Sequence, residues 1–574
     1  MASIRTVSRA MHEPSPPAAA PALKTYTGRA AFLSLLASEG IDVMFGNPGT
    51  TELAIMEALS AQSQIEYVLG LQEAVVVAMA DGYARASGRL AACNVHVAPG
   101  LGNAMGSLFN AKFYGSPVLI TAGQQEQGFG LMEPMLYAPL VPIAQSCVKW
   151  ATEVTRVQDL PRIVRRAAKV ATTAPTGPVF ISLPGDILDS RAELDLGRST
   201  RVDTATRPSD AALERLAEAL LGARNAVIIA GHELATTDAL AEAAAFATAL
   251  ALPVYQQTVP SAAHFLSEHP TYWGPISRSQ PQVRETLAAH DMLILLGCDQ
   301  LRMAVFHQVD PMPPGMRVVQ LSERDWELAK NYPAECAIKA NVKETLRALL
   351  RVLDTKLDGT RKEENARKLR ELAKNNWSVR RERAREEALK LVDVRPIEPR
   401  HLMLRLTDVL PRDVVVVEEG LTSTASLLNF LPFRDAQGFF GLASGGIGFA
   451  MAGAIGISLA LRDRPVVAVV GDGSAMYSIQ ALWTAAHLKL PITYVIPNNR
   501  GYRILKERMK SLRGSEQFIG MDFHDPEIDF VTLAQSLGVP ARRITDPADV
   551  GPALKAAMQR GGPSLLDVAV AEGF

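Results

Sequence analysis

The stretch RPVVAVVGDGSAMYSIQALWTAAHLKLPITYVIPNNRGY, residues 464–502, contains the pattern of a strand, a helix and a second strand. The strand at 465–470 ends in the loop 471–474, and the strand at 492–496 ends in the loop 497–499. The carboxyl ends of parallel strands meet at one edge of a sheet, where ligands usually bind. The stretch therefore predicts a parallel α/β sheet whose two loops share one ligand site.

The residues of these two loops suit a magnesium diphosphate. Gly471 and Gly473 allow backbone amides to approach phosphate oxygens, and the helix after Ser474 presents its positive end. Asp472 and Asn499, 27 positions apart, supply oxygen ligands of the kind that Mg²⁺ prefers. A lone GDG is more often a simple turn and a lone NN is common in loops, so the prediction depends on their combination.

The same alternation of strands and helices runs through the 574 residues and predicts an α/β fold with three domains, each a doubly wound parallel sheet. We expect an N-terminal domain at 26–195, a middle Rossmann-like domain at 208–354 and a C-terminal domain at 399–574. A charged helical linker is expected at 355–398. A Pro/Ala-rich disordered arm is expected at 1–25.

Composition excludes several classes of partner. Charged residues make up 21% of the chain and the formal net charge is −1, so no nucleic-acid or membrane partner is expected. The uncharged run 439–461 is long enough to span a bilayer, but its glycines predict a tight loop that feeds a buried helix from about Phe449. Four scattered cysteines without metal spacing indicate packing residues in a reducing cytoplasm: Cys93, Cys147, Cys298 and Cys336.

A single acid, Glu73, begins an apolar helical run in YVLGLQEAVVVAMADGYA, residues 67–84. The simpler interpretation is a solvated carboxylate in the first turn of a helix, where the macrodipole favours negative charge. The alternative is a buried carboxylic acid that keeps its proton for a ligand.

Several motifs together resemble one enzyme family. The GDGS and NN pair resembles the thiamin diphosphate (ThDP) motif of the pyruvate decarboxylase and acetolactate synthase superfamily. Within it, FGNPGTTEL, LQEAVVVAMADGYARASG, NVHVAPGLGNAMGSL, PVLITAGQQ and FHQVDP most resemble benzoylformate decarboxylases. The resemblance runs from Tyr26 to the C-terminus and implies a ThDP-dependent decarboxylase-like fold.

The resemblance implies ThDP and Mg²⁺ as cofactors and gives each motif a role. Glu73 falls on the position that hydrogen-bonds N1′ of the pyrimidine, Ile447 on the residue that bends the cofactor, and Gly445 on the carbonyl that accepts from the 4′-amino group. The implied metal ligands are Asp472, Asn499 and Gly501, and the further cofactor contacts are Thr422, Gly473, Ser474 and Tyr502.

Two histidines and a threonine are the other implied catalytic residues. For His96 or His307 alone, a structural role is the simpler interpretation. The resemblance makes both of them proton donors and acceptors, a task for which histidine is suited near neutral pH. Thr50 stands where the family usually has a serine that binds the substrate carboxylate.

The implied substrate pocket is apolar and contains one cation. Gly441 and Arg508 stand where the family tends to have aromatic residues, which predicts a wider pocket with a positive end. The alternative is that Arg508 lies on a solvated helix. The implied lining residues are Met135, Leu136, Leu421, Leu505 and Arg508.

These features predict a carbon–carbon lyase that decarboxylates an aryl or bulky 2-oxo acid to an aldehyde. A ThDP carboligase or lyase of the acetolactate synthase or benzaldehyde lyase type is the close alternative, and a non-catalytic ThDP-binding subunit a weaker one. A dinucleotide oxidoreductase is discounted because GLGNAMG, from Gly100, is one residue too long for the fingerprint. The resemblance also implies at least a homodimer, usually a homotetramer, and leaves open a flavin in the middle domain.

Overall fold

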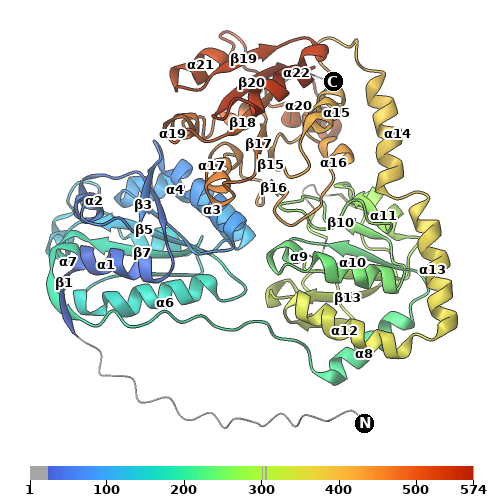
Figure 1. Ribbon diagram of the computed structural model, residues 1–574, viewed down its shortest axis with the longest axis horizontal. Coiled ribbons are helices and arrows are strands. Elements are labelled where there is room, and N and C mark those ends of the chain that lie inside the picture. The colour runs from blue at the N-terminus through green and yellow to red at the C-terminus, as the bar shows by residue number, and fades with distance from the viewer. Residues whose placement is uncertain (1–22, 300, 304–306, 573–574) are drawn as a thin grey trace, which may run out of the picture.

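Three six-stranded parallel sheets, each covered by helices, form the body of the molecule (Figure 1). The computed structural model describes residues 23–299, 301–303 and 307–572. Most of the predicted arm, 1–25, lies outside the described residues. Its last two residues are part of a strand, β1 (Lys24–Thr27), which pairs antiparallel with β8 (Arg191–Leu194), so the prediction of disorder is wrong there.

The N-terminal sheet has the strand order β3-β2-β4-β5-β7-β6. Its apolar strands are buried on both faces, as expected when helices cover both sides of a parallel sheet. The strands are β2 (Val43–Gly46), β3 (Glu66–Leu69), β4 (Ala91–Val95), β5 (Val118–Gln124), β6 (Trp150–Glu153) and β7 (Val179–Pro184). The longer helices are α1 (Gly28–Ser38), α3 (Glu73–Ser87), α4 (Val97–Tyr114) and α6 (Leu160–Thr172).

The middle sheet has the order β11-β10-β9-β12-β13-β14. Its strands are β9 (Ala226–Ala230), β10 (Val254–Gln256), β11 (Tyr272–Pro275), β12 (Met292–Leu296), β13 (Arg317–Ser322) and β14 (Cys336–Lys339), and its helices include α8 (Asp210–Leu221), α10 (Leu240–Ala249), α11 (Gln280–Leu287) and α12 (Val342–Lys356). Two charged helices, α13 (Gly359–Ala373) and α14 (Trp377–Leu389), then run along the edge of the molecule to the C-terminal domain (Figure 1).

The C-terminal sheet has the order β16-β15-β17-β18-β20-β19. Its strands are β15 (Val415–Glu419), β16 (Phe439–Gly441), β17 (Val466–Val470), β18 (Ile492–Asn498), β19 (Ala541–Ile544) and β20 (Ser564–Ala569). Its helices include α15 (Pro399–Val409), α17 (Ala450–Ala460), α19 (Ala481–His487), α20 (Arg503–Arg513) and α22 (Pro547–Met558). The order repeats that of the N-terminal sheet strand for strand.

Helices α3 and α17 occupy equivalent places in these two domains and cross each other closely (Figure 1). A Cβ atom on Gly82 would lie 2.2 Å from the carbonyl oxygen of Gly453, and one on Gly456 would lie 1.9 Å from that of Met79. Since neither distance leaves room for a methyl group, glycine is what allows this contact between the two domains.

The uncharged run 439–461 forms β16, a glycine-rich loop and α17. Helix α17 begins at Ala450, next to the predicted start, and all but one of its residues are buried. Among the residues that the structure describes, no helix combines the length and the apolar character that crossing a membrane requires.

Candidate active site

The carboxylate of Asp472 joins the loops that follow β17 and β18. It is almost fully buried and accepts hydrogen bonds from the backbone amides of Gly473 (2.8 Å), Asn499 (3.1 Å) and Gly501 (3.2 Å). Burial raises the pKa of Asp472 to about 6. The two loops predicted to share a site are therefore adjacent.

A third loop, after β15, reaches the same site through a serine. The side-chain amide of Asn499 donates to Ser423 Oγ at 3.1 Å. The sequence predicted Thr422 here, and the structure has Thr422 half-buried one position earlier. Ser423 was missed, because a run of hydroxyl residues does not reveal which hydroxyl faces a neighbouring loop.

These groups fit a hydrated divalent cation. The Asp472 carboxylate, the amide oxygen of Asn499 and the carbonyl of Gly501 are hard oxygen donors of the kind that suits Mg²⁺. The described residues contain no group of three or more His, Cys, Asp or Glu that could hold a metal. Since these loops offer the single carboxylate of Asp472, a cation bound there needs further oxygen ligands, which a diphosphate would supply.

The surroundings of Gly473 leave no room for a side chain. A Cβ atom at this position would lie 2.6 Å from the ring of Tyr502, which stacks edge-on against Phe523 at 4.8 Å between centroids. Ser474 is buried beside it in the short helix α18 (Asp472–Ala475).

The glycine-rich loop before α17 carries the residues predicted to contact the pyrimidine. Gly445 has a φ of +86° and Gly448 a φ of +118°, a conformation that favours glycine. Ile447 lies between them, half-buried. Glu419 accepts from the amides of Gly448 and Ala450, which fixes the loop to the start of α17. Burial raises the pKa of Glu419 to about 7.

Glu73 is the first residue of α3, where Gln72 accepts from two helix amides as the N-cap. Its side chain is buried and accepts a hydrogen bond from Asn103 Nδ2 at 3.1 Å. A Cβ on Gly100 would lie 2.9 Å from its carboxylate oxygen. Glu73 is thus a buried acid in the N-terminal domain and not the solvated one of the simpler interpretation.

His96 follows β4 and is held by a buried acid. Its Nδ1 lies 2.8 Å from Glu52 Oε2 and 3.2 Å from Thr51 Oγ1. Glu52 is fully buried and accepts from the amides of Gly49 (2.9 Å) and Gly123 (2.8 Å). Because these bonds fix the carboxylate, the imidazole has a defined orientation.

Sequence reasoning missed both partners of His96. It predicted Thr50 for the substrate, and the structure has Thr50 exposed in the turn η1 (Thr50–Glu52). Thr51 faces the histidine instead. The signal was present in NPGTTEL, where an acid follows two hydroxyls, but a turn does not show which residue points inward.

The predicted substrate residues are dispersed over the chain. Met135, Leu136 and Leu505 are 85%, 41% and 45% exposed. Arg508 is half-buried on α20 and has no ion-pair partner within the described ranges. The backbone amide of His307 donates to Gln280 Oε1 at 2.6 Å.

Two further observations concern the pocket. Leu421 is half-buried with a φ of +50°. The widening predicted from Gly441 is wrong, because a Cβ there would lie 2.3 Å from the carbonyl oxygen of Pro260, so the main chain fills that space. A cavity of about 390 Å³ instead opens beside Gly445, lined by residues that include Phe113, Val259, Leu301, Met303 and Ser444.

Two groups predicted to contact one pyrimidine ring meet α3 at different points. Glu73 is its first residue, whereas Ser444, next to Gly445, is joined through Asn110 to Asp81 in the middle of the helix. Asp81 is eight residues beyond Glu73, a distance of about 12 Å along a helix.

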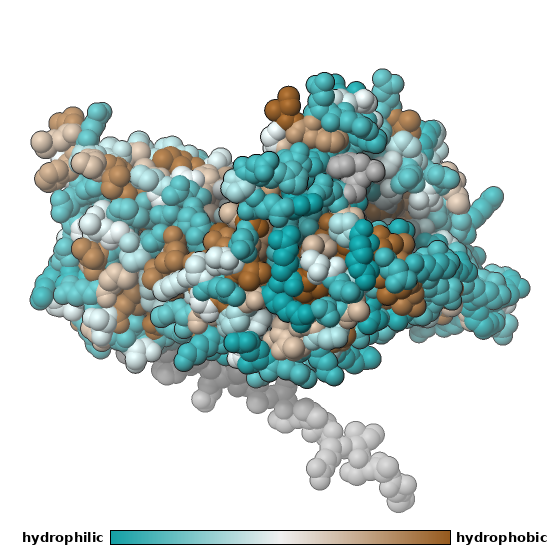
Figure 2. Space-filling model, turned by 90° about the horizontal axis from the view of Figure 1, so that it is seen from above, coloured by the Kyte–Doolittle hydropathy of each residue, from teal (hydrophilic) through white to brown (hydrophobic). Residues whose placement is uncertain are grey.

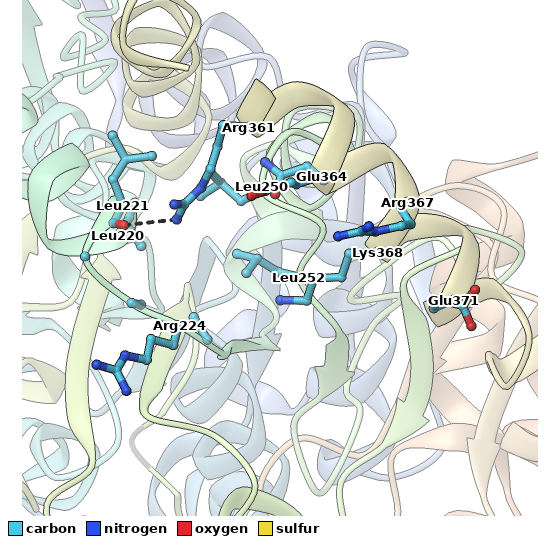
Figure 3. Close-up of a pocket in the computed structure, with 14 residues that line it drawn as sticks. Leu220, Leu221, Arg224, Leu250, Leu252, Arg361, Glu364, Arg367, Lys368 and Glu371 are labelled. Atoms are coloured by element: carbon cyan, nitrogen blue, oxygen red, sulfur yellow. Dashed lines mark hydrogen bonds between the residues drawn. The ribbon is translucent and has the colours of Figure 1, made fainter. Parts of the chain in front are cut away.

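A separate cavity of about 920 Å³ lies at the amino-terminal edge of the middle sheet, between α8 and α13 (Figure 3). Arg361 donates there to the carbonyl of Leu221 at 3.2 Å. Exposed charges of both signs line it, including Arg367, Glu364 and Glu371. It shares no residue with the site described above.

Three domains of known proteins match this chain in order. The N-terminal TPP binding domain of thiamine pyrophosphate enzymes matches residues 26–131, their central domain 213–349, and their C-terminal TPP binding domain 422–568. Thiamine pyrophosphate is the same compound as thiamin diphosphate.

Individual relatives match over nearly the whole length. Benzoylformate decarboxylase of Pseudomonas aeruginosa is 31% identical over 94% of this chain and 98% of its own. The acetolactate synthase large subunit of Parasynechococcus marenigrum is 26% identical over 96% and 88%. The solved structure of the ThDP-dependent 4-hydroxybenzoylformate decarboxylase of Rhodococcus jostii RHA1 superposes with a TM-score of 0.85 at 29% identity, covering 96% of this chain and all of the other.

Proposed function

Since this chain belongs to the thiamin diphosphate-dependent enzymes, as a carbon–carbon lyase, we propose that it decarboxylates an aryl or bulky 2-oxo acid to the aldehyde. The observation that carries the proposal is the pair of His96 with buried Glu52, 2.8 Å apart at the carboxyl edge of the N-terminal sheet. Addition of a nucleophile to a 2-oxo acid leaves negative charge on the former carbonyl oxygen, and a fixed imidazole is a suitable proton donor to that oxygen.

The residues of this chain divide the work as follows. Asp472, Asn499 and Gly501 would hold Mg²⁺, and the loop groups of Thr422, Ser423 and Ser474 would receive the diphosphate. When bound, thiamin diphosphate would supply the electron sink for the carbon that loses CO₂. Glu73 would hold a proton at N1′, the carbonyl of Gly445 would accept from the 4′-amino group, and Ile447 would pack against the cofactor.

The substrate is bound and protonated by side chains from two domains. The Thr50 hydroxyl binds the substrate carboxylate. Because Nδ1 of His96 faces Glu52, its Nε2 is the nitrogen that serves the substrate during addition. His307, from the middle domain, delivers the proton that completes the aldehyde.

The active unit is at least a homodimer. The loop of Gly445 is held about two turns of α3 beyond Glu73, so a complete site would combine Glu73 of one copy with Gly445 of another. Apolar side chains exposed beside these groups support such an interface, and hydrophobic residues are visible among hydrophilic ones on the face in Figure 2. The exposed large apolar side chains of the chain include Leu71, Phe109, Met132, Met476 and Tyr477. A tetramer, as a pair of such dimers, is the expected assembly.

A carboligase is the second candidate. It would use the same cofactor groups and add a second carbonyl compound in place of the final proton. Two observations support it: the similarity to acetolactate synthase, and the cavity of about 390 Å³ beside Gly445, which could hold that second compound.

The four described cysteines are free, in keeping with the cytoplasmic location expected from the sequence.

One assay separates these functions. Purified protein with ThDP and Mg²⁺ is given benzoylformate, its 4-carboxy analogue or 2-oxoglutarate, and CO₂, aldehyde and hydroxyketone are measured. Cofactor-dependent CO₂ with an equal amount of aldehyde supports the decarboxylase, whereas hydroxyketone as the main product supports the carboligase. Absence of CO₂ with all three acids counts against both.

The same assay on Arg508→Leu tests the cationic end of the pocket. Plain aryl acids are expected to be preferred, with acids that carry a second carboxylate next. If Arg508 binds that carboxylate, its loss should reduce kcat/KM for the 4-carboxy analogue about ten- to a hundredfold and spare benzoylformate. An unchanged ratio assigns Arg508 to the solvated helix.

A further inference from the structure

A buried polar cluster connects α3 and α4 to the loop that carries Gly445. At its centre is Asp81, whose side chain is fully buried. Arg85 donates to it from Nε at 2.8 Å and from Nη2 at 2.7 Å. Asn110 Nδ2 donates to it at 3.0 Å, and the hydroxyl of Ser116 adds a further short bond.

The outer side of this cluster holds main-chain groups of the loop. Asn110 Oδ1 accepts hydrogen bonds from the backbone amides of Ala443 (3.2 Å) and Ser444 (3.0 Å). Arg85 Nη1 donates to the carbonyl of Gly441 at 3.1 Å. Three backbone groups within the four consecutive residues 441–444 are thus bonded to the N-terminal domain of the same chain.

The cluster itself is a firm support. The guanidinium of Arg85 lies between the rings of Tyr114, at 4.1 Å, and Phe449, at 4.3 Å. Both charges of the Asp81–Arg85 pair are inaccessible to solvent. Removing one partner would leave a buried unpaired charge, which is strongly destabilising, so the pair is held in one arrangement.

The tip of the loop has one hydrogen bond of its own, from the Gly446 amide to Ser444 Oγ at 3.1 Å. Gly445 and Gly446 are exposed, and a Cβ atom on Gly445 would meet nothing within 4 Å. The direction of the Gly445 carbonyl is therefore set by the bonds at Ala443 and Ser444 on one side and by Glu419, through Gly448, on the other.

We propose that Asn110, supported by Asp81 and Arg85, is a positioning residue that presents the Gly445 carbonyl to the pyrimidine of the cofactor. The inference rests on the proposed function, since it assumes that Gly445 accepts from the 4′-amino group. A loop held in place before binding loses less freedom when the cofactor arrives, which strengthens binding.

The arrangement gives α3 and α4 two tasks in a dimer. Glu73, at the start of α3, and Asn103, in the first half of α4, serve one cofactor. Asn110, seven residues or about 10 Å further along α4, supports the loop that serves the other. One rigid pair of helices thus positions groups in two active sites.

The test compares Asn110→Ala with Ser116→Ala. Each removes one hydrogen bond to Asp81, but only the first also releases Ala443 and Ser444. With saturating Mg²⁺, Asn110→Ala should weaken ThDP binding about ten- to thirtyfold in calorimetry, as expected for two lost bonds. Ser116→Ala should bind ThDP as the wild type does. Both apo-proteins should have a lower Tm than the wild type, and Asn110→Ala should lose more because it lacks three hydrogen bonds rather than one.

Equal ThDP affinity of Asn110→Ala and wild type overturns the inference, and so does an equal loss in both variants. Wild type that binds no ThDP overturns the proposed function and the inference with it, so the two failures differ. A second measurement needs no variant. In the wild-type apo-protein, the amides of Ala443 and Ser444 should exchange hydrogen slowly and that of Gly445 fast. Equally fast exchange at all three also overturns the inference.

Discussion

The N-terminal and C-terminal sheets share one strand order, yet different chemistry lies at their carboxyl edges. After the third strand of the N-terminal domain comes His96, and after the equivalent strand of the C-terminal domain comes Asp472. At each edge a buried carboxylate links neighbouring loops, Glu52 in the N-terminal domain and Asp472 in the C-terminal domain. Glu52 contacts an imidazole and two backbone amides, whereas Asp472 contacts only backbone amides.

This difference shows how one fold supports two tasks. The topology decides where loops meet, and the residue types at that place decide what they bind. An acid facing a histidine orients a proton carrier. An acid surrounded by backbone amides is a ligand with no competing side chain, which suits a metal. The following predictions test this division.

The largest effect should come from Asp472→Ala. The change removes the single carboxylate of the proposed metal site and the bonds that join two loops, so ThDP and Mg²⁺ binding should be lost in calorimetry. Asp463→Ala, exposed before the opposite end of β17, is the matched control and should bind normally. Cofactor affinity retained in Asp472→Ala would show that the metal lies elsewhere.

Glu73→Gln should separate binding from turnover. The diphosphate anchor remains intact, so ThDP affinity should stay near that of the wild type. Turnover should fall about 10²- to 10⁴-fold, because the acid that holds a proton at the pyrimidine is gone. The control is Glu66→Gln, a half-exposed acid on β3. Full activity of Glu73→Gln would refute its assignment.

Glu419→Gln should change how stability depends on pH. Burial raises the pKa of Glu419 from 4.5 to about 7, so folding favours the protonated form. Its contribution to stability is therefore complete below about pH 4.5 and is lost as the pH rises through 7. Gln does not titrate, so the wild type should lose up to about 3 kcal/mol relative to the variant over this range. Urea unfolding of both proteins at pH 4.5 and pH 8 measures it, and a constant difference would contradict the prediction.

Glu52→Gln should have the smallest effect. The imidazole of His96 stays in place but loses its fixed anionic partner, so kcat should fall about tenfold while ThDP affinity is unchanged. Thr51→Val, which removes the longer contact to the same nitrogen, serves as the comparison and should cost less. If Glu52→Gln weakens ThDP binding instead, the acid belongs to the cofactor site.

Local sequence patterns were sufficient to predict the order of strands and helices and the two adjacent loops that carry Asp472 and Asn499. The valine-rich run before GDGS and the apolar run before NN lie in β17 and β18, because buried parallel strands have this composition. The fixed spacing between them brings Asp472 and Asn499 together.

Contacts between distant segments were beyond the reach of sequence. Glu52 is fixed by Gly123, 71 residues later. The space expected at Gly441 is filled by Pro260, which belongs to another domain. In the charged linker, one local signal was overlooked. Asn376 is the N-cap of α14, and it marks the point where the segment divides into two helices.

The close crossing of α3 and α17 also has a practical meaning for redesign. A library aimed at the proposed substrate pocket can vary Met135, Leu505 and Arg508, because these residues are at least partly exposed. At Gly82 or Gly456, by contrast, even alanine would force two backbones apart. Libraries that include these two glycines should yield mostly insoluble clones, and those that exclude them should keep most variants available for selection.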